Sequence, residues 1–474
     1  MQLLPLDPAA DPSPAALRDF LVQCQEAASR SGRPKLVSIS LEVDSLDPLA
    51  VLESIFEPPE RHFYVERPSE RLAVAGAEAV LAFTASGPGR FAACQRFIDE
   101  TLEHTLAVGD LSAPFSGPHF FAAFAFADSV QPDEPFDAAS VFVPRWQVAH
   151  RDGRTVAVAN LLVDASTPIA ALAERVIRAH AKFGAFDYAA PEFQARNAAV
   201  QARVGEVGGD GSYAEAVRRA LSDIAAGDLQ KIVLARAKDL VATETLHPLR
   251  ALNGLRQRFS DCYAFSVANG RGQSFIGASP ERLLRAGDGR LLTEALAGSA
   301  ARGTTASEDA AIASALLRDD KELREHQLVL GSIVGALASL GLAPEFPGRP
   351  DIRRYANVQH LHTPVQAALP GNIRLLDVLA RLHPTPAVGG SPRDGAIARI
   401  RELEAFPRGL YAGALGWIDS AGRGEFFVCL RSALIDGPRA RLYAGAGILA
   451  GSSPQKELAE TEMKFQVMED ALKA

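Results

Sequence analysis

Short apolar runs with a period of two alternate along the first part of the chain with longer segments of helical period. The runs LVSISLEV (36–43), RLAVAGA (71–77) and HFFAAFAFA (119–127) predict strands. Residues 90–104 and 168–183 place apolar side chains three and four positions apart, which predicts amphipathic helices. An Asp-Gly step at 152–153, between two apolar runs, predicts a β-hairpin.

The second part repeats this alternation with sharper boundaries. Ser212 and Glu215 form an S-x-x-E pattern that predicts a capping box at the start of a helix ending near Gly227. KIVLARAKDLVA (231–242) then predicts a strand that places Lys231 and Val233 on one face. A long helix is predicted from about 307 to 340, and proline after Ser453 indicates the start of the last helix.

Two further hairpins are predicted at Asp288-Gly289 and at Asp436-Gly437. The second would follow EFFVCLRSALI (425–435), interpreted as one continuous strand. A polar stretch from 184 to 211 is either an interdomain linker or an excursion within one domain. We favour the excursion, because the strands predicted after it are too few to close a core on their own.

Composition is that of an ordinary globular protein. Of 474 residues, 47% are apolar and 22% are charged, so a large core can be buried. The net charge of −8 argues against a nucleic-acid partner, which usually requires a basic surface. It does not exclude a small anionic substrate, because a bound metal ion can invert the local field.

Targeting signals and cysteine motifs do not change this picture. Cys24, Cys94, Cys262 and Cys429 are dispersed without ligand spacing, as expected for buried thiols in a reducing cytoplasm. The first twenty residues lack the basic start and apolar stretch of a signal peptide. The run FFAAFAFA (120–127) is too short to span a bilayer, so we expect a cytoplasmic protein without a membrane partner.

Two residues are candidates for proton transfer. Lys231 opens an apolar strand, where it is either a solvated strand-end lysine or a buried base whose pKa is lowered by desolvation. Glu281, in the segment GASPERLL, is either a buried general acid or an ion-pair partner of Arg282 or Arg285. Neither residue decides between its alternatives alone.

Two acidic pairs with a spacing of three are candidates for a metal site. Glu322 with Glu325, and Glu457 with Glu460, would each present two carboxylates on one helical face. Each pair alone is explained by a solvated helix face. If the two helices face each other, four carboxylates suit a hard cation such as Mg²⁺.

Other polar residues stand in unusual positions. Arg431 lies in an apolar run and would need an anionic partner. His360 and His362 are two apart on an extended segment, where structural hydrogen bonding is a simpler interpretation than metal ligation. Turns at Gly298-Ser299 and around Gly445 and Gly447 allow the backbone to approach an anion closely.

Taken together in their order, these segments resemble the chorismate-utilising enzymes, from about residue 212 to the end. That family includes anthranilate, aminodeoxychorismate, salicylate and isochorismate synthases. The matching segments are KIVLAR, GASPERLL, EALAGSAARG, KELREHQLV, QHLHTP, HPTPAVGG, RGLYAGALGW, FFVCLRSALI, LYAGAGILAGSSP and KELAETEMK. The first half resembles the more variable amino-terminal region of the same fold.

The resemblance implies an anthranilate synthase component I-like α/β (α+β) fold, with two large, mostly antiparallel sheets packed together and helices outside. Residues 1–200 would form the variable part and residues 205–474 the chorismate-binding region, both within one intertwined unit. Ammonia-using relatives carry glutamine in place of Lys231, so lysine implies activated water and no glutaminase subunit. Ala297 occupies the position of a nucleophilic lysine in some aminodeoxychorismate synthases. Isochorismate synthases are therefore the best match, in menaquinone or siderophore supply.

The same resemblance implies a role for each matching residue. Lys231 would activate water for attack at carbon 2 of chorismate, and Glu281 would protonate the hydroxyl leaving carbon 4. Glu325 and Glu457 would bind Mg²⁺, with Glu322 and Glu460 completing the site. Substrate contacts would come from Gly298, Ser299, His360, Ala387, Tyr411, Arg431, Gly445, Ala446, Gly447 and Lys464.

Two alternatives remain at this point. A salicylate synthase would use the same lysine and glutamate and then eliminate pyruvate. A binding protein without activity on the same scaffold is the alternative from another class. The sequence leaves the oligomeric state open.

Overall fold

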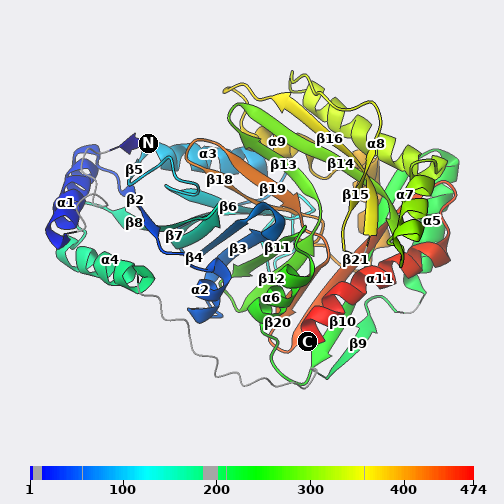
Figure 1. Ribbon diagram of the computed structural model, residues 1–474, viewed down its shortest axis with the longest axis horizontal. Coiled ribbons are helices and arrows are strands. Elements are labelled where there is room, and N and C mark those ends of the chain that lie inside the picture. The colour runs from blue at the N-terminus through cyan, green and yellow to red at the C-terminus, as the bar shows by residue number, and fades with distance from the viewer. Residues whose placement is uncertain (4–12, 56, 185–200, 210, 357, 474) are drawn as a thin grey trace.

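The computed structural model describes residues 1–3, 13–55, 57–184, 201–209, 211–356 and 358–473 (Figure 1). Its strands join into one hydrogen-bonded network with helices on the outside. In the described part of the chain, all strand pairings are antiparallel except those of β5 (Thr105–Val108) with β1 (Gln2–Leu3) and with β2 (Lys35–Val43). The α/β class and the mostly antiparallel pairing expected from the sequence are confirmed.

The network has two sheets that meet at β7 (Ala139–Arg151), which pairs with β8, β4 and β6. The first sheet passes from β5 and β2 through β8 (Arg154–Val163), β7, β4 (Leu72–Ala85), β3 (Arg61–Arg67), β11 (Tyr263–Asn269), β12 (Gln273–Ser279), β20 (Ser432–Asp436) and β21 (Arg439–Leu449) to β10 (Lys231–Ala242). The second passes from β6 (His119–Phe124) through β18 (Ala414–Asp419), β19 (Gly424–Val428), β13 (Arg282–Gly287), β14 (Arg290–Ala301) and β16 (Val358–Ala368) to β15 (Asp351–Arg354).

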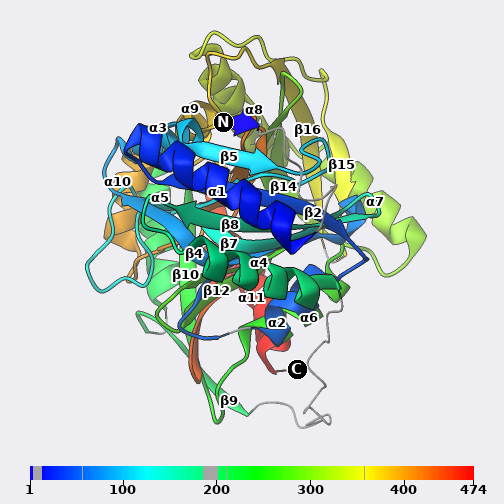
Figure 2. The ribbon, with the colours of Figure 1, turned by 90° about the vertical axis from the view of Figure 1, so that its left-hand side faces the viewer.

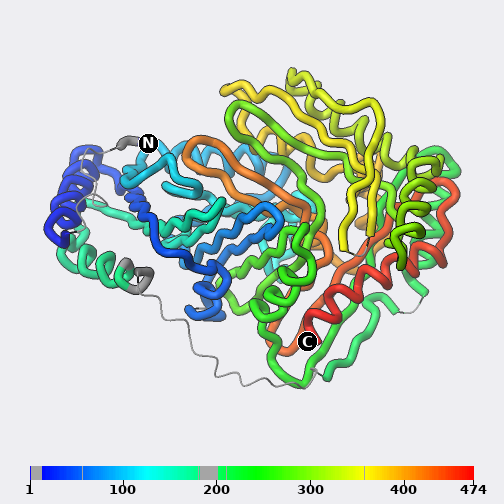
Figure 3. Tube along the Cα trace, in the orientation of Figure 1, coloured from blue at the N-terminus to red at the C-terminus, as the bar shows by residue number. Residues whose placement is uncertain are grey.

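Strands from the two halves of the sequence are direct neighbours in both sheets. β3 pairs with β11, and β6 pairs with β18. At one edge, β10 also pairs with the short β9 (Ala202–Glu206) and β17 (Gly390–Ser391). The tube in Figure 3 shows how the blue and orange segments of the chain lie side by side as a result.

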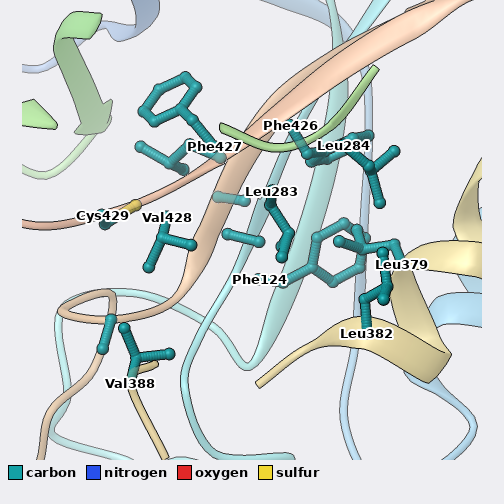
Figure 4. Packing of buried hydrophobic residues seen from close by; sticks show 14 of the residues in the cluster. Phe124, Leu283, Leu284, Leu379, Leu382, Val388, Phe426, Phe427, Val428 and Cys429 are labelled. Carbon is teal, nitrogen blue, oxygen red and sulfur yellow. The ribbon is translucent and has the colours of Figure 1, made fainter. Parts of the chain in front are cut away.

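The main core covers both faces of the second sheet. Phe427 of β19 stacks on Tyr263 of β11 and so fills the space between the two sheets. Phe124 and Phe426 meet on the opposite face, with Leu379 and Leu382 of α9 (Leu375–Leu382) packed against them (Figure 4). A separate cluster joins α1 (Pro14–Ser31) and α4 (Ile169–Gly184) to the outer face of β2 and β8 (Figure 2). The remaining α-helices are α2 (Pro48–Ser54), α3 (Arg90–Glu103), α5 (Ser212–Ala226), α6 (Pro248–Arg258), α7 (Ala306–Leu316), α8 (Asp320–Ala338), α10 (Arg393–Leu403) and α11 (Pro454–Lys473).

Most of the predicted elements are present. The strands near 36–43, 71–77, 119–127 and 231–242 correspond to β2, β4, β6 and β10, and the helices at 90–104 and 168–183 to α3 and α4. The three predicted hairpins join β7 to β8, β13 to β14, and β20 to β21. Residues 185–200 and 210 of the polar stretch lie outside the described residues. Among those described, no helix is long and apolar enough to cross a membrane.

The single helix predicted over 307–340 is wrong, because the chain breaks at Asp319. This residue has an extended backbone (φ −77°, ψ 114°), and its carboxylate accepts hydrogen bonds from the N–H groups of Lys321 and Glu322. These hydrogen bonds satisfy backbone N–H groups that have no partner within the first turn of a helix. The cap therefore fixes where α8 begins and places Glu322 in its first turn.

Two other predictions fail for local reasons. Ser212 does not cap α5, because the helix begins at this residue with Gly211 at the cap position and φ +84°; the Ser212 hydroxyl donates to the Gly209 carbonyl instead. The strand predicted over 425–435 is interrupted after Val428. Arg431 has φ +47°, a left-handed conformation that ends one strand and redirects the chain before the next.

We expect Asp319→Ala to loosen the first turn of α8, because loss of an N-cap acceptor costs about 1 kcal/mol. Hydrogen exchange at the amides of Lys321 and Glu322 should accelerate roughly fivefold, which is the population change equivalent to that energy. Asp320→Ala is the matched control, because Asp320 is equally exposed and is not the cap. Equal exchange in both variants would contradict the assignment of the cap.

Candidate active site

The candidate residues gather around one cavity of about 140 Å³. It is bounded by the C-terminal part of β14, the segment after β12, the middle of β21, and the helices α8 and α11. Of the residues predicted from the sequence, those that line it are Glu281, Gly298, Ser299, Glu322, Glu325, His360, Ala387, Tyr411, Arg431, Gly445, Gly447, Glu457, Glu460 and Lys464. Lys231 and Ala446 do not line it.

Lys231 lies directly behind the cavity wall. It is the first residue of β10, its side chain is 0% exposed, and its Nζ lies 2.7 Å from Oε1 of Glu325. The absence of a side chain at Gly447 makes this pair possible, since a Cβ there would stand 2.9 Å from Glu325 Oε1 and 3.1 Å from Lys231 Cε. The solvated strand-end alternative is therefore wrong. Burial leaves the amine with a carboxylate partner rather than with apolar neighbours alone.

Glu281 occupies the short connection between β12 and β13 and is 7% exposed. Burial raises the pKa of its carboxyl group to about 8, and the nearby charge of Glu294 adds to this increase. Arg282 pairs instead with Glu70 and Glu425. The ion-pair alternative for Glu281 is not realised among the described residues, and the group is placed as a buried, protonated acid.

The four predicted carboxylates come from two helices that face the same cavity. Glu322 and Glu325 lie on α8, and Glu457 and Glu460 lie on α11. Burial raises the pKa of Glu322 and of Glu457, and the charge of Glu325 adds to the increase at Glu322. Such crowding of desolvated negative charge favours a cation between the helices.

An ammonium group of the protein already lies between these helices. Lys321 Nζ is 3.7 Å from Glu322 Oε1 and 3.6 Å from Glu457 Oε1. As the side chains stand, no three acidic, histidine or cysteine groups of the described chain are close enough together to chelate an ion. The donor set fits a hard cation in type and number, and ligation would require the Glu322 and Glu457 carboxylates to exchange Lys321 for that cation.

Lys464 connects α11 to the glycine-containing strand β21. Its Nζ donates to Glu460 Oε1 at 2.7 Å and to the Gly445 carbonyl oxygen at 2.8 Å. Burial alone would raise the pKa of Glu460, but the charge and hydrogen bond of Lys464 hold it below the usual value. Glu460, like Glu325, thus has a lysine in direct contact.

A β-bulge shapes the wall opposite α11. The pairing of β14 with β16 shifts register between Ala297 and Ser299, where Gly298 adopts φ +79°. The shift lets the Ser299 N–H donate to Glu322 Oε2 at 2.9 Å, while the Ser299 hydroxyl hydrogen-bonds His360 Nδ1 at 2.8 Å. Nε2 of His360 is buried without a partner, and burial lowers the pKa of this ring to about 3. His360 therefore offers a neutral imidazole to the cavity.

Arg431 also lines the cavity. Nη1 of Arg431 is buried and has no hydrogen-bond partner in the described structure. Tyr411 stacks on Tyr443 with ring centroids 5.2 Å apart, beside the Gly445 backbone. These groups suit a carboxylate, which a guanidinium binds strongly in a site shielded from water. Ala446 is buried and alternates to the opposite face of β21, so a side-chain contact from it is not supported.

Sequence reasoning missed three positions that organise the site. Lys321 was passed over because it lies in a highly charged run, where a solvated lysine is the ordinary interpretation. Arg408 is buried and donates to the carbonyls of Val388 and Val233, and Glu404 pairs with it at 2.6 Å. This pair ties β10 to the loop that carries Ala387. Glu404 and Arg408 are only four positions apart, but the local sequence pattern does not indicate their contact with Val233, which lies 175 positions from Arg408.

Comparisons with known proteins agree with this geometry. The family model described as "Chorismate binding enzyme" matches residues 20–473. The isochorismate synthase MenF of Bacillus subtilis is 34% identical over 92% of this chain and 93% of its own length. The salicylate biosynthesis isochorismate synthase of Pseudomonas aeruginosa is 35% identical over 97% of this chain and 94% of its own length.

Solved structures show the same architecture. The menaquinone-specific isochorismate synthase MenF of Escherichia coli superposes with a TM-score of 0.77 at 27% identity, covering 95% of this chain and 99% of that protein. Anthranilate synthase component I of Streptococcus pneumoniae, at 21% identity and a TM-score of 0.70 over 84% of this chain and 92% of that one, shares the fold. This chain belongs to the chorismate-binding enzyme family.

The raised pKa of Glu281 predicts a pH dependence of stability. Between the unfolded value of 4.5 and the folded value of about 8, the folded state holds a proton that the unfolded state has lost. This contribution is therefore complete below pH 4.5, decreases as the pH rises towards 8, and is absent above it. Relative to Glu281→Gln, the wild-type free energy of unfolding should fall with pH across this window.

Urea unfolding at a series of pH values measures that difference. Glu345→Gln, which removes one exposed carboxylate elsewhere, is the matched control and should run parallel to the wild type. Parallel curves for wild type and Glu281→Gln would mean that Glu281 is ionised in the folded protein.

Proposed function

We propose that the protein is an isochorismate synthase, which converts chorismate reversibly to isochorismate in menaquinone or siderophore supply. The observation that carries this proposal is that Glu281, whose pKa burial raises to about 8, lines the same cavity as Glu325, the partner of the buried Lys231. The similarity to isochorismate synthases over at least 92% of the chain supports the same activity.

The reaction moves a hydroxyl group within one ring. Lys231 would accept a proton from a water molecule whose oxygen forms a bond to carbon 2. The two ring double bonds shift, the bond between carbon 4 and its hydroxyl breaks, and Glu281 supplies the proton with which that hydroxyl leaves as water. Water enters and water leaves, so the product is an isomer. Acid and base supplied by separate side chains suit this exchange.

Lys231 must first be accessible to water, since it is covered by the Glu325 carboxylate. The same carboxylate is one of the proposed metal ligands. The amine and the cation therefore compete for Glu325, and this competition links the two parts of the site.

Chorismate is a dianion, so its binding in an acidic cavity needs positive charge. We assign the enolpyruvyl carboxylate to Arg431, with Tyr411 and the Gly445 backbone beside it. One pair of unit charges 4 Å apart is worth about 4 kcal/mol at an effective dielectric of 20. Gly298 and Ser299 would line the side of the ring carboxylate, with His360 near the reacting face.

Mg²⁺ is the cofactor that we propose for the acidic group. Glu325 and Glu457 would bind it, with Glu322 and Glu460 completing the site. When bound, the ion would neutralise these carboxylates and the ring carboxylate of the substrate. Arg431 and Glu281 keep their roles in binding and proton transfer within that arrangement.

The test is the product formed from chorismate by the purified protein with Mg²⁺. Isochorismate without pyruvate supports the proposal, whereas pyruvate release coupled to lactate dehydrogenase would identify a salicylate synthase. Lys231→Ala should lower kcat by about 10²- to 10⁴-fold, the usual contribution of a general base. The exposed Lys456→Ala on α11 is the control. Undiminished activity of Lys231→Ala would exclude water activation by this residue.

The metal assignment predicts a specific defect in Glu457→Gln. Loss of one anionic ligand should raise the Mg²⁺ concentration for half-maximal activity by roughly tenfold or more, equivalent to about 1.4 kcal/mol. Calorimetric titration with Mg²⁺ alone gives the same comparison without turnover. Glu462→Gln on the same helix lies outside the cavity and serves as the control. An unchanged Mg²⁺ requirement would refute the metal site.

A further inference from the structure

A second buried carboxylate, Glu294 on β14, lies behind the proposed acid and outside the cavity. One of its oxygens, Oε2, accepts a hydrogen bond from Nε2 of His362 at 3.0 Å. The other, Oε1, accepts from the backbone N–H of Arg282 at 3.3 Å, and that residue directly follows Glu281. Two hydrogen bonds thus fix Glu294, one from His362 on β16 and one from the backbone that follows Glu281.

We propose that Glu294 is a positioning residue that keeps Glu281 in its protonated form, and that His362 holds Glu294 in place for this purpose. This inference rests on the proposed function, in which Glu281 is the general acid. It assigns an electrostatic role to a pair of residues that do not touch the cavity.

The partners of the two carboxylates are unequal. Burial would raise the pKa of Glu294, but the hydrogen bond from His362 and the charges of Arg282 and Arg353 outweigh it and hold that pKa below the usual value. No described residue forms an ion pair with Glu281. When two neighbouring buried carboxyl groups compete for one proton, the proton stays on the group with fewer cationic partners.

The other charges near Glu281 act in the opposite direction. Lys231 on β10 and Lys464 on α11 both lower its pKa, while Glu294 on β14 raises it, and burial is the largest influence. The Tyr355 hydroxyl donates to the carbonyl of Pro280, which directly precedes Glu281, and burial raises the pKa of this hydroxyl, so that it adds no charge. Glu294 is therefore the anion that offsets two lysines, and without it the acid would be more readily ionised.

Burial also separates this role from a merely structural one. A buried ionised carboxylate is costly unless it has a counter-charge. The strand β14 could form its backbone hydrogen bonds and pack its side chains without such a group. A glutamine has nearly the same shape, and its amide oxygen can still accept from the Arg282 N–H, while its NH2 group can donate to Nε2 of His362 in the tautomer that is protonated at Nδ1. Glu294→Gln consequently removes the charge and preserves the shape.

The experiment compares the pH dependence of kcat in wild type and Glu294→Gln, with saturating chorismate and Mg²⁺. Activity of the wild type should decline as Glu281 ionises near its pKa of about 8. In Glu294→Gln this decline should move to lower pH by roughly one unit, within the range that one neighbouring charge produces. KM for chorismate should stay within about twofold, because Glu294 does not reach the cavity.

A second readout does not depend on turnover. Glu281 makes the free energy of unfolding fall as the pH rises. In Glu294→Gln this fall should end at a lower pH than in the wild type. His362→Phe, which removes the donor to Glu294, should shift both curves in the same direction. The double variant should shift no further than Glu294→Gln alone, because the two residues act through one charge. Glu345→Gln is the control for the loss of one exposed carboxylate and should shift neither curve.

The outcomes separate this inference from the proposed function. Suppose that Glu281→Gln abolishes activity. If Glu294→Gln then loses activity equally at every pH, or loses none, the positioning role of Glu294 is overturned, while Glu281 stands as the proposed acid. If Glu281→Gln retains wild-type activity, the proposed acid itself is wrong. Additive shifts in the double variant would refute the linkage of His362 to Glu294.

Discussion

A buried charge needs a counter-charge, and the cavity of this protein is built around that constraint. Lys231 has no exposed surface, and the Glu325 carboxylate 2.7 Å away is its partner. The pair joins the first residue of β10 to the first turns of α8, so that a sheet edge and a covering helix are fixed relative to each other. Gly447 makes the contact possible because a side chain there would collide with both partners.

The same constraint organises the rest of the site. Lys321 lies between Glu322 and Glu457, and Lys464 pairs with Glu460, so each acidic side chain on the two helices has a lysine within reach. Arg431 is the exception, since one of its nitrogens is buried without any acceptor. Four acids that each have a lysine nearby, and one guanidinium nitrogen that has no acceptor among the described residues, leave a cavity suited to an anion.

Glu281 obeys the constraint in a different way. It has no cationic partner in contact, and burial therefore keeps it protonated rather than paired. Glu294 differs from it, because the hydrogen bond from His362 and the charges of Arg282 and Arg353 hold the pKa of Glu294 below its usual value. In the proposed mechanism, proton transfer would therefore depend in part on residues that do not line the cavity.

What the sequence by itself determined was local. The period of the apolar positions predicted β2, β4, β10 and the hairpins, and the ordered segments identified the family and most of the polar residues that line the cavity. It failed where a single backbone conformation decided the outcome, as at Asp319, which divides a predicted helix, and at Arg431, whose positive φ interrupts a predicted strand. Only the tertiary structure decided that Lys321 bridges two helices, that Glu325 covers Lys231, and that Glu294 lies beside the acid. The physical reason is that periodicity indicates which face of an element is buried, whereas charge pairing depends on which elements meet. Two side chains that pair in the cavity can be far apart in the chain, as Lys321 and Glu457 are, at 136 positions.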